Sequence, residues 1–129
     1  MNEDGGRLAE ATAVAFRHVV EMGYRIESRG SSGRGEAVDV IGDVVRISIS
    51  ADWLEGEIDV ELQAVGHAAL PLDSVVDLGQ VHGLHLRRIS RSVTRDQLVS
   101  TLTKVVDALV AQVPGVLAET PEGLARLGA

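Results

Sequence analysis

Three acidic residues, Glu57, Asp59 and Glu61, stand at every second position near the middle of the chain. Side chains two positions apart on a β-strand project from the same face, about 6 to 7 Å from one another. Such a row of carboxylates attracts a basic surface, and oxygen ligands of this kind also suit a hard cation. A solvated strand face is the ordinary alternative to either kind of site.

A second candidate is the basic segment that contains Arg87, Arg88, Arg91 and Arg95, with no acidic residue between His82 and Arg95. It runs into a predicted helix, and a helix N-terminus favours negative charge. The four guanidinium groups could therefore contact a phosphate or a carboxylate. The alternative is a solvated basic segment that balances an acidic body.

Ligands for zinc could come from His67, His82 and His85, with Asp77 as an oxygen ligand. On a strand, however, His82 and His85 would project to opposite faces, so we predict no metal site. The glycine-rich segment 30–35 lacks the Lys-Ser/Thr ending of a phosphate-binding loop, and the chain has neither a Gly-x-Ser-x-Gly motif nor a dinucleotide fingerprint. We predict no catalytic residue and no cofactor.

The chain whose helices and strands must position these residues has 129 residues. This length is typical of one domain with one core, so we predict a single domain over residues 1–129. Hydrophobic residues make up 45% and charged residues 24%, as in folded globular chains. The absence of cysteine excludes disulfides and thiolate ligands.

The formal net charge of −7 arises in residues 1–65, which carry 13 acidic and six basic side chains, whereas residues 66–129 carry six of each. An acidic surface repels nucleic-acid phosphates and anionic membranes, so we expect neither as a partner. No apolar run reaches membrane-spanning length, and the acidic first residues are unlike a signal peptide. We therefore expect a cytoplasmic protein.

Apolar residues at helical spacing predict an amphipathic helix over residues 7–22. Gly23 can adopt the left-handed conformation that ends a helix, and Tyr24 can then fold back on the last turn. A short helix is expected between residues 71 and 80, and a final helical turn from Thr120.

A long C-terminal helix begins with Thr94 and Gln97, which form a capping box. Its apolar stripe consists of Leu98, Leu102, Val105, Val106, Leu109 and Val113. Pro114 ends the helix.

Alternating apolar residues predict a hairpin over residues 38–49. Its turn is placed at Gly42-Asp43, a pair that suits a two-residue turn. This register would set Asp39 opposite Arg46.

The strand that carries the acidic row follows at residues 57–62. Pairing Ile49 with Ile58 would set Arg46 beside Glu61. Three further segments complete the pattern: a short strand at residues 24–27, a loop at 28–35, and a segment at 81–89 that is either a loop or an edge strand.

The predicted fold class is therefore α+β, with an antiparallel meander sheet and the N-terminal and C-terminal long helices packed on one face. The other face, which carries the acidic row, would remain exposed to solvent.

A helix that leads into Gly23-Tyr24-Arg25 is followed by Val44–Ile49, by Glu57–Glu61 and by Leu70-Pro71-Leu72 before a short helix. In this pattern the segment from residue 16 to residue 78 resembles small uncharacterised bacterial α+β proteins, some grouped with the immunity proteins of polymorphic toxin systems. The resemblance implies a protein that binds and blocks a cognate toxin. The order of elements is also similar to that of secretion chaperones, which are acidic dimers that bind partner chains, and this leaves a homodimer open.

We predict a non-enzymatic domain that binds a protein partner through Glu57, Asp59 and Glu61. The alternative is an enzyme that binds a small molecule or an anion through the segment from Arg87 to Arg95. A cleft with converging polar groups would favour the enzyme, and a flat acidic face would favour the binding protein.

Overall fold

The computed structural model describes residues 6–129 and contains one antiparallel sheet. Its strands follow one another in chain order: β1 (Arg25–Ser31), β2 (Gly35–Ile41), β3 (Val45–Asp52), β4 (Glu57–Ala64) and β5 (Leu70–Pro71). The helical elements are α1 (Gly6–Ala15), α2 (Arg17–Glu21), the 3-10 turns η1 (Leu72–Ser74) and η2 (Leu78–Gln80), α3 (Arg95–Gln112), α4 (Pro114–Leu117) and α5 (Pro121–Ala125). The predicted α+β class and antiparallel meander are confirmed.

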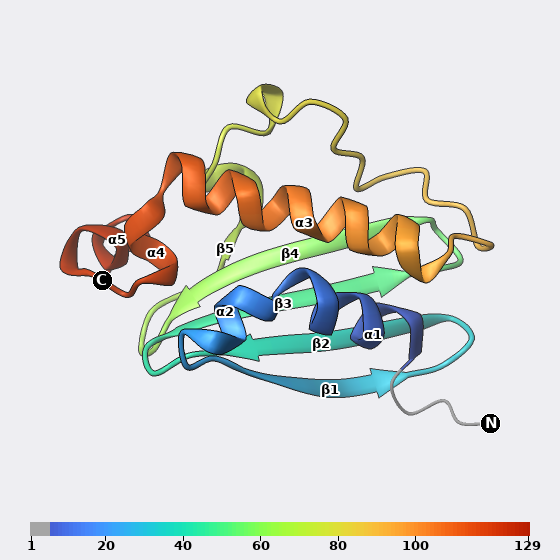
Figure 1. The fold of residues 1–129 in the computed structure, drawn as a ribbon, viewed down its shortest axis with the longest axis horizontal. Coiled ribbons are helices and arrows are strands. Elements are labelled where there is room, and N and C mark those ends of the chain that lie inside the picture. Colours follow the sequence, from blue (N-terminus) through green and yellow to red (C-terminus); the bar gives the residue numbers. More distant parts are fainter. Residues whose placement is uncertain (1–5) are drawn as a thin grey trace.

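Helices α1, α2 and α3 lie over the same face of the sheet (Figure 1). Every second strand residue points toward these helices and contributes to the core. The core includes residues with no exposed surface, such as Ile47, Ile49, Leu98 and Leu102. Within residues 6–129, no helix combines the length and apolar character needed to cross a membrane.

The prediction of two long helices is only half correct. Helix α3 has 18 residues, but the N-terminal helix is divided into α1, with 10 residues, and α2, with five. The division falls at Phe16, whose backbone angles are φ −99° and ψ 20°. Helical hydrogen bonds continue across Phe16, so the side-chain period that predicted one helix is almost undisturbed.

The predicted ends of both helical segments are confirmed. Gly23 has a φ of +116°, and the N–H of Tyr24 donates to the carbonyl of Val19, as in a Schellman ending. Thr94 and Gln97 form the capping box of α3. Val113 caps its other end, directly before the proline that starts α4.

The predicted hairpin register is wrong by two residues, because Asp39 pairs with Ser48 and not with Arg46. The turn lies one residue later, at Asp43-Val44, where the N–H of Gly42 donates to the carbonyl of Val45. A shift of two residues keeps the same side chains on the buried face, so hydrophobic alternation cannot distinguish the two registers.

A contact distant in sequence stabilises the observed turn. The Oε2 atom of Glu119 accepts the backbone N–H groups of Val44 and Val45, at 2.6 and 2.8 Å. A Cβ on Gly42 would lie 2.7 Å from the ring of Tyr24, so only glycine fits at this position.

The pairing of β3 with β4 also differs from the prediction by two residues. Ile49 pairs with Val60, and Ser48 lies opposite Glu61. Arg46 is therefore beside Gln63, away from Glu61.

Three other segments are corrected. Residues 28–35, predicted as a loop, mostly belong to β1 and β2, and only residues 32–34 connect the two strands. The helix expected between residues 71 and 80 is replaced by β5, η1 and η2, and Asp77 caps η2. Residues 81–89 form no strand, although two of their backbone groups bond to β4 and to the turn before it.

Candidate functional site

The sheet face opposite the helices carries the predicted partner-binding residues. Glu57, Asp59 and Glu61 all project from β4 on this open face, since the residues between them, Ile58 and Val60, are buried in the core. The prediction of a shared face for the three carboxylates is therefore confirmed by the strand.

Carboxylates from other strands lie on the same face. The strand pairing aligns Glu27, Asp39, Ser48 and Glu61 across β1 to β4. The acidic residues of the open face are Glu27, Asp39, Asp52, Glu57, Asp59 and Glu61, and the arginines of its strands are Arg25, Arg29 and Arg46. Arg25 pairs with Glu27 at 2.8 Å, and Arg29 pairs with Asp39 at 2.9 Å, which leaves the excess of negative charge on the side of β4.

A hollow of about 210 Å³ occupies the middle of the open face. Its lining includes the short side chains of Ser48 and Ser50, which lie opposite the longer side chains of Glu61 and Asp59 on β4. Asp59 and Glu61 border it from β4, and Arg29 also lines it. This hollow is thus lined mostly by polar residues, with two carboxylates on its β4 side.

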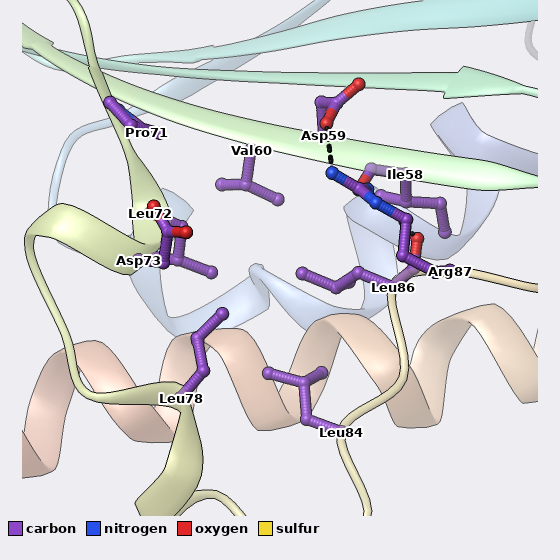
Figure 2. A pocket seen from close by; sticks show the side chains of 10 residues that line it. All are labelled: Ile58, Asp59, Val60, Pro71, Leu72, Asp73, Leu78, Leu84, Leu86 and Arg87. Carbon is purple, nitrogen blue, oxygen red and sulfur yellow. Dashed lines mark hydrogen bonds and ion pairs between the residues drawn. The ribbon is translucent and has the colours of Figure 1, made fainter.

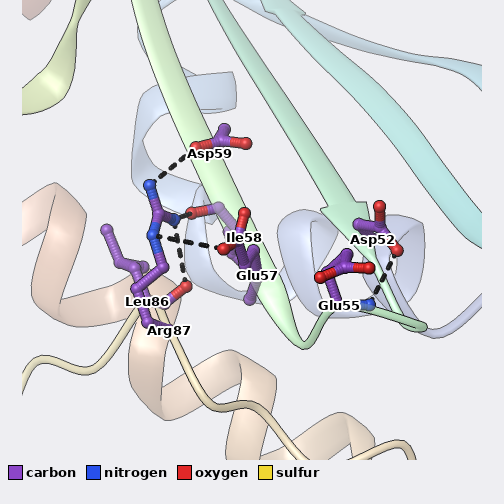
Figure 3. A network of polar contacts seen from close by, with 7 residues as sticks. All are labelled: Asp52, Glu55, Glu57, Ile58, Asp59, Leu86 and Arg87. Carbon is purple, nitrogen blue, oxygen red and sulfur yellow. Dashed lines mark hydrogen bonds and ion pairs between the residues drawn. The ribbon is translucent and has the colours of Figure 1, made fainter.

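Arg87 joins the two sets of residues that the sequence presents separately. Its guanidinium donates to Asp59 at 3.1 Å, and its Nε lies 4.0 Å from a carboxylate oxygen of Glu57 (Figure 3). The same guanidinium donates to the backbone carbonyl of Ile58 at 2.9 Å. Arg87 therefore neutralises part of the acidic row and fills a position where a neighbouring strand would donate a hydrogen bond.

The backbone around Arg87 holds it against the edge of β4. The N–H of Ile58 donates to the carbonyl of Leu86, and the N–H of Ile89 donates to the carbonyl of Gly56, each at 2.8 Å. Gly56 has a φ of +69°, and a Cβ there would lie 2.7 Å from the carbonyl oxygen of Ile89. The glycine thus permits the close approach of the two segments.

Glu61 differs from its two neighbours on β4. Among the residues that the structure describes, no cationic group lies within 4.0 Å of its carboxylate. Its side chain is exposed at the border of the hollow. Glu61 is therefore the member of the row that is open to a cation from outside.

The other arginines of the basic segment have separate roles. Arg95 pairs with its neighbour Asp96 at 3.3 Å, and the carbonyl of Arg91 accepts a hydrogen bond from Arg7. Arg88 has a φ of +60°, which is uncommon for a residue with a side chain. The anion-binding role of Arg87, Arg88, Arg91 and Arg95 remains a prediction, with two of the four guanidinium groups already paired with carboxylates.

His82 and His85 are exposed. Between residues 6 and 129, no group of three or more His, Cys, Asp or Glu side chains is placed to hold a metal ion.

Sequence reasoning missed the contacts of Arg7. This side chain donates to the carbonyls of Arg91 and Val93 and lies over the ring of Trp53, 4.6 Å from its centroid. These contacts connect α1 to the segment before α3. An arginine and the only tryptophan, 46 positions apart, gave no local signal of this contact.

A second unpredicted cluster surrounds the β2–β3 turn. The hydroxyl of Tyr24 donates to the carbonyl of Leu117 at 3.0 Å. Burial, and then the nearby carboxylates of Glu119 and Asp43, raise the pKa of Tyr24 well above its ordinary value. The cluster joins the C-terminal helices to the sheet and lies outside the acidic row.

Comparison of the chain with protein-family models, with curated proteins and with solved structures gave no match.

Proposed function

We propose that this chain is a non-enzymatic, protein-binding domain of the cytoplasm, similar in action to an immunity protein, which docks a basic partner on the open face of its sheet. The observation that carries the proposal is the excess of carboxylates on the β4 side of a face that no helix within residues 6–129 covers (Figure 1). Exposed charge of one sign steers an oppositely charged partner and accelerates association.

Glu61 and the neighbouring hollow are the centre of this proposed surface. A lysine or arginine side chain of the partner would enter beside the two serines and meet the carboxylate of Glu61. Asp59 and Glu57 would supply longer-range attraction, because Arg87 already occupies part of their hydrogen-bonding capacity.

The test begins with reversal of Glu57, Asp59 and Glu61 to Lys. A matched control reverses Glu10, Glu21 and Asp107, which are exposed residues of the helices, and so changes the net charge equally. A partner captured by the wild-type protein and by the control variant should be lost from the open-face variant. Its association rate with the open-face variant should fall by about tenfold or more at low salt, and the wild-type rate should decrease as salt is added.

Circular dichroism first establishes that both triple variants are folded. Equal loss of binding in the two variants would mean that only the net charge matters. If the open-face variant bound at the wild-type rate, the acidic row would be a solvated strand face and the proposal would be wrong.

A further inference from the structure

An apolar pocket of about 320 Å³ lies beside β4, on the side where β5 and the basic segment approach it. Leu78, Leu84 and Leu86 point toward a common space from the chain that follows η1 (Figure 2). Val60 and Leu72, which also line the pocket, are buried members of the core. The inner wall is thus part of the packed core, while the outer wall consists of half-buried leucines.

The rim of this pocket is charged. Asp59 and Asp73 both line it, together with Arg87. The guanidinium of Arg87 is directed to Asp59 and to the carbonyl of Ile58, and Asp73 is exposed. The two carboxylates outnumber the one guanidinium, so the rim favours a cation over an anion.

Asp59 belongs to the acidic row and also to the pocket rim. The hollow on the open face and the apolar pocket therefore share this residue, together with Val60 and Pro71. A partner that contacts the carboxylates of β4 could therefore also contact the adjacent pocket.

We infer that the pocket holds a bulky apolar side chain of the basic partner, flanked in the partner by lysine or arginine. This inference rests on the proposed function and names the chemistry of the binding segment. Sites for drug-sized ligands span about 300 to 1,000 Å³, so this pocket is at their lower limit and suits a single aromatic side chain. Interfaces concentrate their binding energy in such an anchor, with polar contacts around it.

The test uses three tripeptides with blocked ends, titrated into the isotopically labelled protein and followed by nuclear magnetic resonance. Lys-Trp-Lys contains both proposed elements, Lys-Ala-Lys lacks the anchor, and Glu-Trp-Glu has the opposite charge. We expect Lys-Trp-Lys to shift the signals of Leu84, Leu86 and Glu61, and to bind about tenfold more tightly than either other peptide.

Two variants locate the anchor. Leu84→Trp should fill the pocket and remove the advantage of Lys-Trp-Lys over Lys-Ala-Lys. Leu54→Trp is the matched control, because Leu54 is an exposed leucine outside the pocket, and it should retain that advantage. If Leu84→Trp fails to fold, Leu78→Trp serves as the filling variant, and the comparison of the peptides on the wild-type protein decides independently.

The outcomes separate the inference from the proposed function. Equal binding of Lys-Trp-Lys and Lys-Ala-Lys at Glu61, with unchanged leucine signals, would overturn the apolar anchor and leave charge-directed docking intact. Equal binding of Glu-Trp-Glu would overturn the basic flanks. Tryptamine that bound the pocket as tightly as Lys-Trp-Lys would show a small-molecule site and overturn the peptide anchor. No binding of Lys-Trp-Lys would also overturn the anchor, whereas the proposed function is decided by the association rates of the triple variants.

Discussion

At Arg87, one side chain connects the acidic row to the basic segment, which are 28 residues apart in the chain. Each segment is recognisable from its own residue types, and the shared strand face of Glu57, Asp59 and Glu61 follows from the alternation of a strand. The ion pair itself depends on the path of a segment without regular secondary structure. No periodic pattern encodes that path, so the sequence could not show that the two candidate sites meet.

A prediction at the scale of one residue concerns Tyr24, the only tyrosine in the chain. Because its pKa is raised in the folded protein, tyrosinate absorbance should develop in the native protein only at a pH well above the ordinary value of about 10. The unfolded chain should lose the proton first. The free energy of unfolding should therefore be unaffected by this group below about pH 10 and should decrease as the pH rises above it.

Spectroscopic titration of the native and the urea-unfolded protein measures the two pKa values directly. In Glu119→Gln, one of the nearby negative charges is removed, so the native titration should begin at a lower pH than in the wild type. Coincident native and unfolded titration curves would contradict the buried environment of Tyr24.

At the scale of elements, the ends of α3 and the class of most strands follow from local chemistry, whereas register does not. The capping box at Thr94 is formed by residues three positions apart, so the sequence contains all of it. The β2–β3 turn is stabilised instead by Glu119, which lies 75 positions from Val44. Alternation fixed which residues are buried but allowed pairing shifts of two residues.

Helix α3 provides the prediction at this scale. Leu102 has no exposed surface, so Leu102→Ala should lower the free energy of unfolding by about 2 to 5 kcal/mol. Val110 lies on the same helix and is 54% exposed, so Val110→Ala should change it by about 0.5 kcal/mol or less. Denaturant melts of the two variants measure the difference, and equal losses would place the buried face of α3 elsewhere.

At the scale of the whole molecule, two layers enclose one core, with helices on one side of a five-stranded sheet. Trp53 is 3% exposed at the end of β3 and is covered by Arg7 of α1, so its fluorescence reports the contact between the layers. Far-ultraviolet circular dichroism reports mainly the helices.

If residues 1–129 form the single domain expected from their length, the two signals should follow the same denaturation curve. The measurement is a urea melt observed by both methods on one sample. Separate midpoints would show that the layers unfold independently, and the chain would then contain more than one cooperative unit.

The position of Leu86 and Arg87 against the edge of β4 also bears on self-association. A strand from another molecule can pair with a sheet only where the backbone groups of its edge are unpaired. At Ile58, both the N–H and the carbonyl already have hydrogen-bond partners. Further along β4, the two residues of β5 pair with this edge. β5 has only two residues, so in the described part of the chain the longer outer strand of the sheet is β1, with seven. A polymer built by strand addition needs a long outer strand at both edges of every molecule, whereas the described sheet has one, so addition along β1 would join two copies in a closed pair.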